Sequence, residues 1–208
     1  IKTVSIENTH LASGGSIVSF KSIKSLSNLV RQHELKLHVD GARIWHAILE
    51  DNNSMNYGSY CDSLTFCFSK ALGAPIGSIL LGSEQFIKEA REFRKKLGGG
   101  MRQVGVIASM AGVALQNREI ILDDHAKAKK VYEFLNSSLN NEKIERIVYK
   151  GTNMIFLNIK NEEDPKKLLD IFYNESINAG LIGEKSIRLV FHHDILQNDI
   201  DKICKKLV

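Results

Sequence analysis

A lysine at the end of an apolar run is the residue best placed for covalent chemistry in this sequence. Residues 64–68 read Leu-Thr-Phe-Cys-Phe, a pattern typical of a buried strand, and Ser69 and Lys70 follow directly. A turn rich in small residues comes next, and a second apolar run covers 79–81. Burial can lower the pKa of a lysine towards neutrality, and the free amine can then form a Schiff base. The alternative interpretation is a lysine that only leaves the core and reaches water, because lysine seldom stays fully buried.

An acidic residue stands at the end of an earlier strand pattern. Residues 35–40 predict this strand, which ends in Asp40 and is followed by Gly41 and Arg43. Asp40 precedes Lys70 by 30 residues, a spacing that fits a strand, a helix and a parallel strand. Ligands bind at the carboxyl ends of the strands in open α/β sheets. We therefore expect Asp40 and Lys70 to lie at the same edge of a parallel sheet.

These two residue types are compatible with one kind of cofactor chemistry. A lysine that forms a Schiff base and an acid that faces a pyridinium nitrogen are what a pyridoxal phosphate enzyme requires. The carboxylate keeps the ring nitrogen protonated, so that the ring can accept the electron pair left by bond cleavage at the α-carbon of an amino acid. With pyridoxal 5'-phosphate as the cofactor, Lys70 and Asp40 would be the catalytic residues, and the alternative of a lysine that only reaches water stays open on the residues alone.

Four segments carry a resemblance to a known family, in matching order and spacing. They are residues 6–10 (Ile-Glu-Asn-Thr-His), 38–44, 68–78 and 98–103. From about residue 5 to about residue 194 the chain resembles the low-specificity threonine aldolases, which belong to the β-eliminating lyase group of fold-type-I pyridoxal phosphate enzymes. The resemblance implies retro-aldol cleavage of threonine or allo-threonine to glycine and acetaldehyde. It also implies a homo-oligomer, a dimer or a tetramer, in the cytoplasm.

The resemblance assigns two arginines to the substrate. It makes Lys70 the residue that holds the cofactor, and it places Arg43 beside the cofactor and close to the substrate carboxylate. Arg188, in the segment 186–194, matches the arginine that grips the same carboxylate. A planar guanidinium suits a carboxylate because it can donate two parallel hydrogen bonds. The alternative for Arg43 is a structural salt bridge, whereas a lone arginine on the apolar strand around Arg188 is costly unless it is paired.

Three further residues enter through the resemblance alone. Asn8 is expected near the ring oxygen of the cofactor, and its alternative role is to cap the local loop. Arg102, after the glycines at 98–100, is expected to reach the cofactor phosphate of a neighbouring subunit. Lys95 is expected near that site and near the substrate. The alternative for Arg102 is solvent exposure at the start of a helix.

The expected fold class is α/β. The resemblance implies that residues 1–122 form part of a fold-type-I cofactor-binding domain with a mainly parallel sheet, and the patterns over 123–208 predict a small α+β domain. Expected strands are 2–8, 35–40, 64–68, 79–81, 144–149, 154–160 and 186–191, and expected helices are 22–34, 84–97, 103–120, 123–139, 165–178 and 198–207. The apolar and small residues of 103–120 predict a helix that is buried on most sides, in the core or at a dimer interface.

The part of the site that holds the cofactor phosphate is not evident in the sequence. No glycine-rich loop that opens a helix is found, and the resembling enzymes carry well over a hundred residues before the point where this chain begins. We therefore expect the chain to correspond to the C-terminal part of such an enzyme. Two alternatives are another β-eliminating lyase of the same fold and an inactive fragment that serves as a structural partner in an oligomer.

Composition excludes several other classes. The chain has 208 residues, 43% hydrophobic and 25% charged, which suits a globular protein. A net charge of +4 on scattered lysines and arginines does not indicate a nucleic-acid surface. No apolar run approaches the 18 residues of a membrane span, and no metal-ligand spacing is found. The three cysteines form no Cys-x-x-Cys pair and fit reduced thiols in a core.

Overall fold

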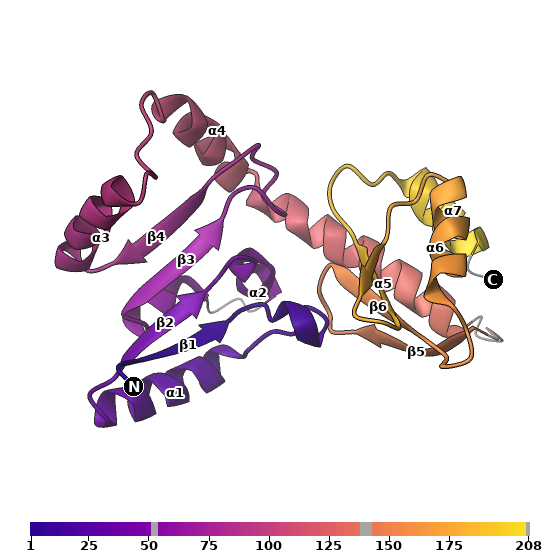
Figure 1. The fold of residues 1–208 in the computed structure, drawn as a ribbon, viewed down its shortest axis with the longest axis horizontal. Helices are drawn as coiled ribbons and strands as arrows, with labels where there is room; N and C mark the ends of the chain where they lie inside the picture. Colours follow the sequence, from indigo (N-terminus) through magenta and orange to yellow (C-terminus); the bar gives the residue numbers. More distant parts are fainter. Residues whose placement is uncertain (51–53, 138–142, 207–208) are drawn as a thin grey trace. The chain divides into compact units, whose positions relative to one another are not determined.

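The chain forms two compact units (Figure 1). The computed structural model describes residues 1–50, 54–137 and 143–206. The first unit comprises Ile1–Thr9 and Ile17–Glu119, and the second comprises His10–Ser16 and the residues from Ile120 onward. The chain therefore passes from one unit to the other three times.

The first unit is built on a four-stranded sheet in the order β1-β2-β3-β4. Its strands are β1 (Thr3–Glu7), β2 (Lys36–Asp40), β3 (Ser63–Cys67) and β4 (Ser78–Gly82). β1 pairs with β2 and β2 with β3 in parallel, while β4 returns antiparallel beside β3. The parallel β2–β3 pair confirms the unit predicted from the spacing of Asp40 and Lys70.

One face of this sheet carries the core of the first unit. Side chains alternate between the two faces of a strand, and Leu37, Val39 and Leu64 are buried while their neighbours are more exposed. The helices α1 (Phe20–Gln32) and α2 (Ile44–Glu50) add buried apolar side chains to the core: Ile23, Val30, Ile44 and Ala47. The short helix η2 (Ser54–Ser59) leads into β3.

Two further helices expose apolar surface, so the helix predicted over 103–120 is not buried in the core of the chain, and its place at a dimer interface stays a prediction. In α4 (Gly105–Gln116) Ala111 is the one buried residue, and no residue of α3 (Glu84–Lys96) is buried. The exposed apolar side chains in and around them are Phe86, Phe93, Leu97, Met101, Val104, Val106, Met110 and Val113. An apolar pattern indicates that a helix face packs against another surface, but it does not show whether that surface belongs to the same chain or to another chain.

The second unit is a small sheet with helices. The 3-10 helix η1 (Leu11–Ser13) precedes α1 in the chain but belongs here, and η3 (Arg118–Ile120) leads into α5 (Ile121–Ser137). The antiparallel strands stand in the order β5-β6-β8-β7. They are β5 (Ile144–Tyr149), β6 (Met154–Ile159), β7 (Gly180–Ile182) and β8 (Ser186–Val190), and the other helices are α6 (Pro165–Asn174) and α7 (Gln197–Lys206).

The core of the second unit confirms its predicted α and β composition. α5, α6 and α7 pack buried apolar residues against the sheet, among them Val131, Phe172 and Ile200, each fully buried. Asp164 caps α6 by accepting a hydrogen bond from the backbone N–H of Lys166, and Pro165 occupies the first turn. Strand β7 was not predicted, and the predicted helix ends at 138–139 and 207 lie outside the described residues.

Within the described part of the chain, no helix is both long and apolar enough to cross a membrane. Cys61, Cys67 and Cys204 are free thiols, and Cys204 lies in the core of the second unit.

Candidate active site

The carboxyl ends of β2 and β3 meet at one edge of the first sheet. Asp40 is the last residue of β2, and its exposed carboxylate accepts a hydrogen bond from the backbone N–H of Ala42 at 3.0 Å. The backbone N–H of Gly41 donates to the carbonyl of Thr65 at 2.7 Å. A Cβ atom on Gly41 would lie 2.7 Å from that same oxygen, so only glycine allows the two strand ends to approach so closely. Gly41 thereby fixes Asp40 beside the end of β3.

Lys70 projects from a well-defined turn that follows β3. The backbone N–H of Phe68 donates to Gly77, and that of Ala74 donates back to Phe68. Leu72 and Ala74 are buried and anchor the turn, whereas Lys70 itself is exposed. The burial that the apolar run suggested for this lysine is therefore not supplied by the described residues. Arg43 is half-buried and lies between Asp40 and α2. The structure thus brings Asp40, Arg43 and Lys70 to the same end of neighbouring strands.

Asn8 lies at the same edge, but its polar groups are hydrogen-bonded to other residues of the chain. Its backbone N–H donates to the carbonyl of Asp40 at 2.9 Å. Its fully buried side chain donates to the Val18 carbonyl and to the Tyr57 hydroxyl, both at 3.2 Å, and accepts from the Val18 N–H at 3.1 Å. Both amide hydrogens of Asn8 are therefore used. Contact between Asn8 and the cofactor ring stays a prediction.

Two predicted residues lie apart from this edge in sequence and on exposed elements. Lys95 is in the last turn of α3, and Arg102 is in the loop between α3 and α4. That loop begins at Gly98, whose φ of 80° favours glycine. The resemblance assigns both residues to a site shared with another subunit, so the structure of one chain leaves that role a prediction.

Arg188 lies in the second unit, at the centre of β8. It pairs with Phe156 of β6 on one side and with Gly180 of β7 on the other. Its Nε atom is buried and has no hydrogen-bond partner among the described residues. A buried guanidinium nitrogen without an acceptor is costly, and a carboxylate is the acceptor that would satisfy it best.

Comparison with known families decides the classification. The family model described as beta-eliminating lyase matches residues 1–160 of this chain. The chain belongs to the β-eliminating lyase family. Among relatives of this chain, the low-specificity L-threonine aldolase of Candida albicans is 36% identical over 208 residues, and that of Escherichia coli K12 is 35% identical over 204. These alignments cover 98% and 97% of this chain but only 52% and 58% of the two relatives, so the chain spans about half their length.

Solved structures show that this chain has the fold-type-I architecture. A putative L-allo-threonine aldolase from Listeria monocytogenes EGD-E superposes with a TM-score of 0.81 at 20% identity, covering 99% of this chain and 60% of that one. The histidinol-phosphate aminotransferase of Clostridium acetobutylicum gives a TM-score of 0.71 at 17% identity, covering 100% and 63%. The predicted fold class is confirmed.

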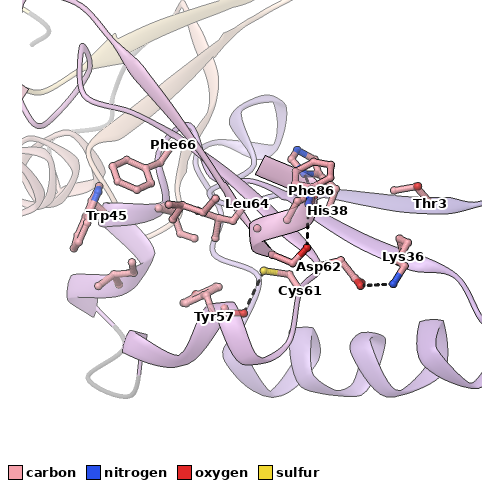
Figure 2. Close-up of a pocket in the computed structure, with 17 residues that line it drawn as sticks. Thr3, Lys36, His38, Trp45, Tyr57, Cys61, Asp62, Leu64, Phe66 and Phe86 are labelled. Carbon is pink, nitrogen blue, oxygen red and sulfur yellow. Dashed lines mark hydrogen bonds and ion pairs between the residues drawn. The ribbon is translucent and has the colours of Figure 1, made fainter. Parts of the chain in front are cut away.

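The chain also has a cavity of about 1070 Å³ in the first unit, and its lining extends from the first residues of the strands to the start of α2 (Figure 2). It is lined by the first residues of β1, β2 and β3, which are Thr3, Lys36 and Ser63. Trp45 and Phe66 stack edge to face at 5.8 Å in its wall. No residue predicted for the active site lines this cavity, although Ile44 and Trp45, which follow Arg43 in the chain, do.

One titratable residue escaped the sequence analysis. Asp124, in the first turn of α5, is fully buried, and neither carboxylate oxygen has a hydrogen-bond partner among the described residues. Burial raises the pKa of Asp124 to about 6, and the ammonium of Lys127, 3.6 Å from one oxygen, opposes the shift. An Asp-Asp pair at the start of a helix looks like an ordinary exposed helix start, so the sequence gives no sign of this burial.

Proposed function

We propose that the protein is a pyridoxal phosphate-dependent lyase of the threonine aldolase type. The reaction is retro-aldol cleavage of threonine or allo-threonine to glycine and acetaldehyde. The observation that carries the proposal is the meeting of Asp40, Arg43 and Lys70 at the carboxyl ends of β2 and β3. Relatives at 35% and 36% identity that are named low-specificity L-threonine aldolases support it.

The residues at this edge fit the proposed cofactor. The amine of Lys70 is exposed and can hold the cofactor covalently. One oxygen of Asp40 is used by Ala42, and the other accepts no hydrogen bond within the described residues, so it can accept one from a pyridinium N–H. When bound, pyridoxal 5'-phosphate supplies an acceptor for the electron pair released at the α-carbon.

The substrate carboxylate is assigned to the two arginines. Arg43 lies three residues beyond Asp40, and the buried Nε of Arg188 lacks an acceptor within the described chain. By fixing the carboxylate, these residues orient the bond between Cα and Cβ for cleavage and raise the effective concentration of the reactive conformer.

Assembly completes the proposed enzyme. The exposed apolar side chains of α3 and α4 support a homo-oligomer, a dimer or a tetramer, in which Arg102 and Lys95 act at a neighbouring site and Arg102 holds the cofactor phosphate. We assign residues 1–122 to part of the cofactor-binding domain, 123–208 to the small domain, and the protein to the cytoplasm. Because the chain spans about half the length of its relatives, we propose that residues 1–208 alone lack aldolase activity.

The experiment that tests the function is release of glycine and acetaldehyde from L-threonine and L-allo-threonine by the protein that contains residues 1–208. Asp40→Asn should lower turnover strongly with a modest loss of cofactor affinity, because a charge-assisted hydrogen bond is roughly twice as strong as a neutral one. Asp123→Asn, at an exposed position in α5, is the matched control and should leave turnover unchanged. Cleavage of neither amino acid, or normal turnover in Asp40→Asn, would contradict the proposal.

A further inference from the structure

The segment that follows β1 contributes residues to both units. Residues 1–9 and 17–119 form the first unit, whereas residues 10–16 belong to the second. The chain therefore leaves the first unit directly after Asn8 and Thr9 and returns to it just before Val18. The two passages flank a single loop.

The base of this loop is closed by Asn8. Its side chain accepts a hydrogen bond from the N–H of Val18 and donates one to the carbonyl of the same residue. These two hydrogen bonds join the residues at which the loop begins and ends. The same side chain donates to Tyr57, and the backbone N–H of Asn8 donates to Asp40. The loop base is thus bonded to the end of β2, where the proposed site begins.

The tip of the loop is fixed within the second unit. Thr152, which is fully buried, donates its hydroxyl hydrogen to the carbonyl of Gly15 at 2.9 Å. Gly15 has a φ of 75°, and a Cβ atom there would lie 2.6 Å from the Thr152 oxygen. Within the loop, the N–H of His10 donates to Ser16 and the N–H of Gly15 donates to His10. Any side chain at position 15 would therefore collide with the Thr152 hydroxyl unless the backbone or Thr152 moved.

We propose that segment 8–18 is a tether that couples the Asp40 end of β2 to the unit that carries Arg188, and that Asn8 and Thr152 are its positioning residues. Asn8 holds the base of the tether and Thr152 holds its tip. Loss of the hydrogen bond between Thr152 and Gly15 should weaken the hydrogen bonds between Asn8 and Val18, since both sets lie in one short loop and only a few residues separate them. The consequence for substrate binding rests on the proposed function, whereas the coupling itself does not.

Hydrogen exchange on the intact chain tests the coupling without cofactor or substrate. Thr152→Val keeps the shape of the side chain but leaves the Gly15 carbonyl without its donor, and it should speed exchange of the His10 and Gly15 amides about tenfold. The amides of Asn8 and Val18, in the other unit, should also exchange several-fold faster. Thr152→Ser retains the hydroxyl and should restore protection at both ends.

Ser186→Ala is the control for general weakening of the second sheet. It removes the 3.0 Å hydrogen bond between Ser186 and Asn158, away from the tether. It should leave the Asn8 and Val18 amides unchanged. Faster exchange at residues 10–16 in Thr152→Val with unchanged Asn8 and Val18 amides would overturn the coupling, and so would equal loss of protection in Ser186→Ala.

The active enzyme supplies the second measurement. Thr152→Val should raise the KM for threonine more than it lowers kcat, because it loosens the hydrogen-bonded base of the segment beside Asp40 without touching Asp40 itself, and Thr152→Ser should restore KM. A fall in kcat with unchanged KM would overturn the positioning role while leaving both the coupling and the aldolase activity intact.

Discussion

Replacing Asp124 by asparagine should stabilise the second unit at neutral and alkaline pH. The carboxylate is fully buried without a hydrogen-bond partner among the described residues, and its pKa is raised to about 6 by burial. In the unfolded chain the pKa of an aspartate is about 3.9. The folded state therefore binds this proton more tightly than the unfolded state does. The favourable contribution of the protonated carboxyl is fully present below about pH 4 and is lost as the pH rises through about 6.

The size of the effect follows from the shift in pKa. A difference of about 2 pKa units corresponds to about 3 kcal/mol of lost stability once the group is ionised in both states. Asparagine has the same shape and no charge, so Asp124→Asn should raise the free energy of unfolding by about 3 kcal/mol at pH 8. At pH 4.5, where the folded carboxyl is mostly protonated, the gain should shrink to about 1 kcal/mol.

Urea unfolding followed by far-UV circular dichroism at pH 4.5 and pH 8 measures both values. Asp123→Asn is the matched control, since Asp123 is the exposed neighbour in the same helical turn. Its stability should change by less than about 0.5 kcal/mol at either pH. The reasoning is refuted if Asp124→Asn is less stable than the native chain at pH 8, which would mean that the ion pair with Lys127 outweighs the cost of burial.

Two other substitutions test how the chain is held together. Gly41→Ala should lower the free energy of unfolding by about 1–3 kcal/mol because the added Cβ meets the Thr65 oxygen. Gly112→Ala, at a position of α4 where an added Cβ meets no other atom, should instead raise the free energy of unfolding by about 1 kcal/mol. Thermal unfolding of both variants measures these changes. Equal effects of the two substitutions would show that the structure relaxes around the added Cβ at Gly41. Asp164→Ala should cost about 1 kcal/mol by removing the cap of α6, and Asp164→Asn should retain most of the stability in the same assay. An unchanged melting temperature in Asp164→Ala would indicate that Pro165 alone fixes the helix start.

Local signals in the sequence predicted most of the elements. Ser83 and Asp164 each cap the helix that follows, and both helix starts were predicted at the correct residue. Gly98, whose φ is positive, follows α3 and marks where the helix ends. The spacing of Asp40 and Lys70 predicted two neighbouring parallel strands because a crossover helix has a restricted length.

Features that depend on distant contacts could not be predicted. The hydrogen bond between Thr152 and Gly15 joins residues 137 positions apart, so the sequence could not show that residues 10–16 belong to the second unit. The burial of Asp124 and the exposure of α4 likewise depend on what packs against them. Strand β7 has three residues, which is too short for the alternation of apolar and polar residues to be recognised.

The central claim is that Lys70 holds pyridoxal phosphate. Borohydride reduction of the cofactor-loaded enzyme, followed by peptide mass spectrometry, should add the reduced cofactor to the peptide that contains Lys70. Lys70→Ala should abolish this label together with absorbance near the visible edge, whereas Lys166→Ala, at an exposed position in α6, should keep both. A label on another lysine, or an unchanged spectrum in Lys70→Ala, would contradict the account.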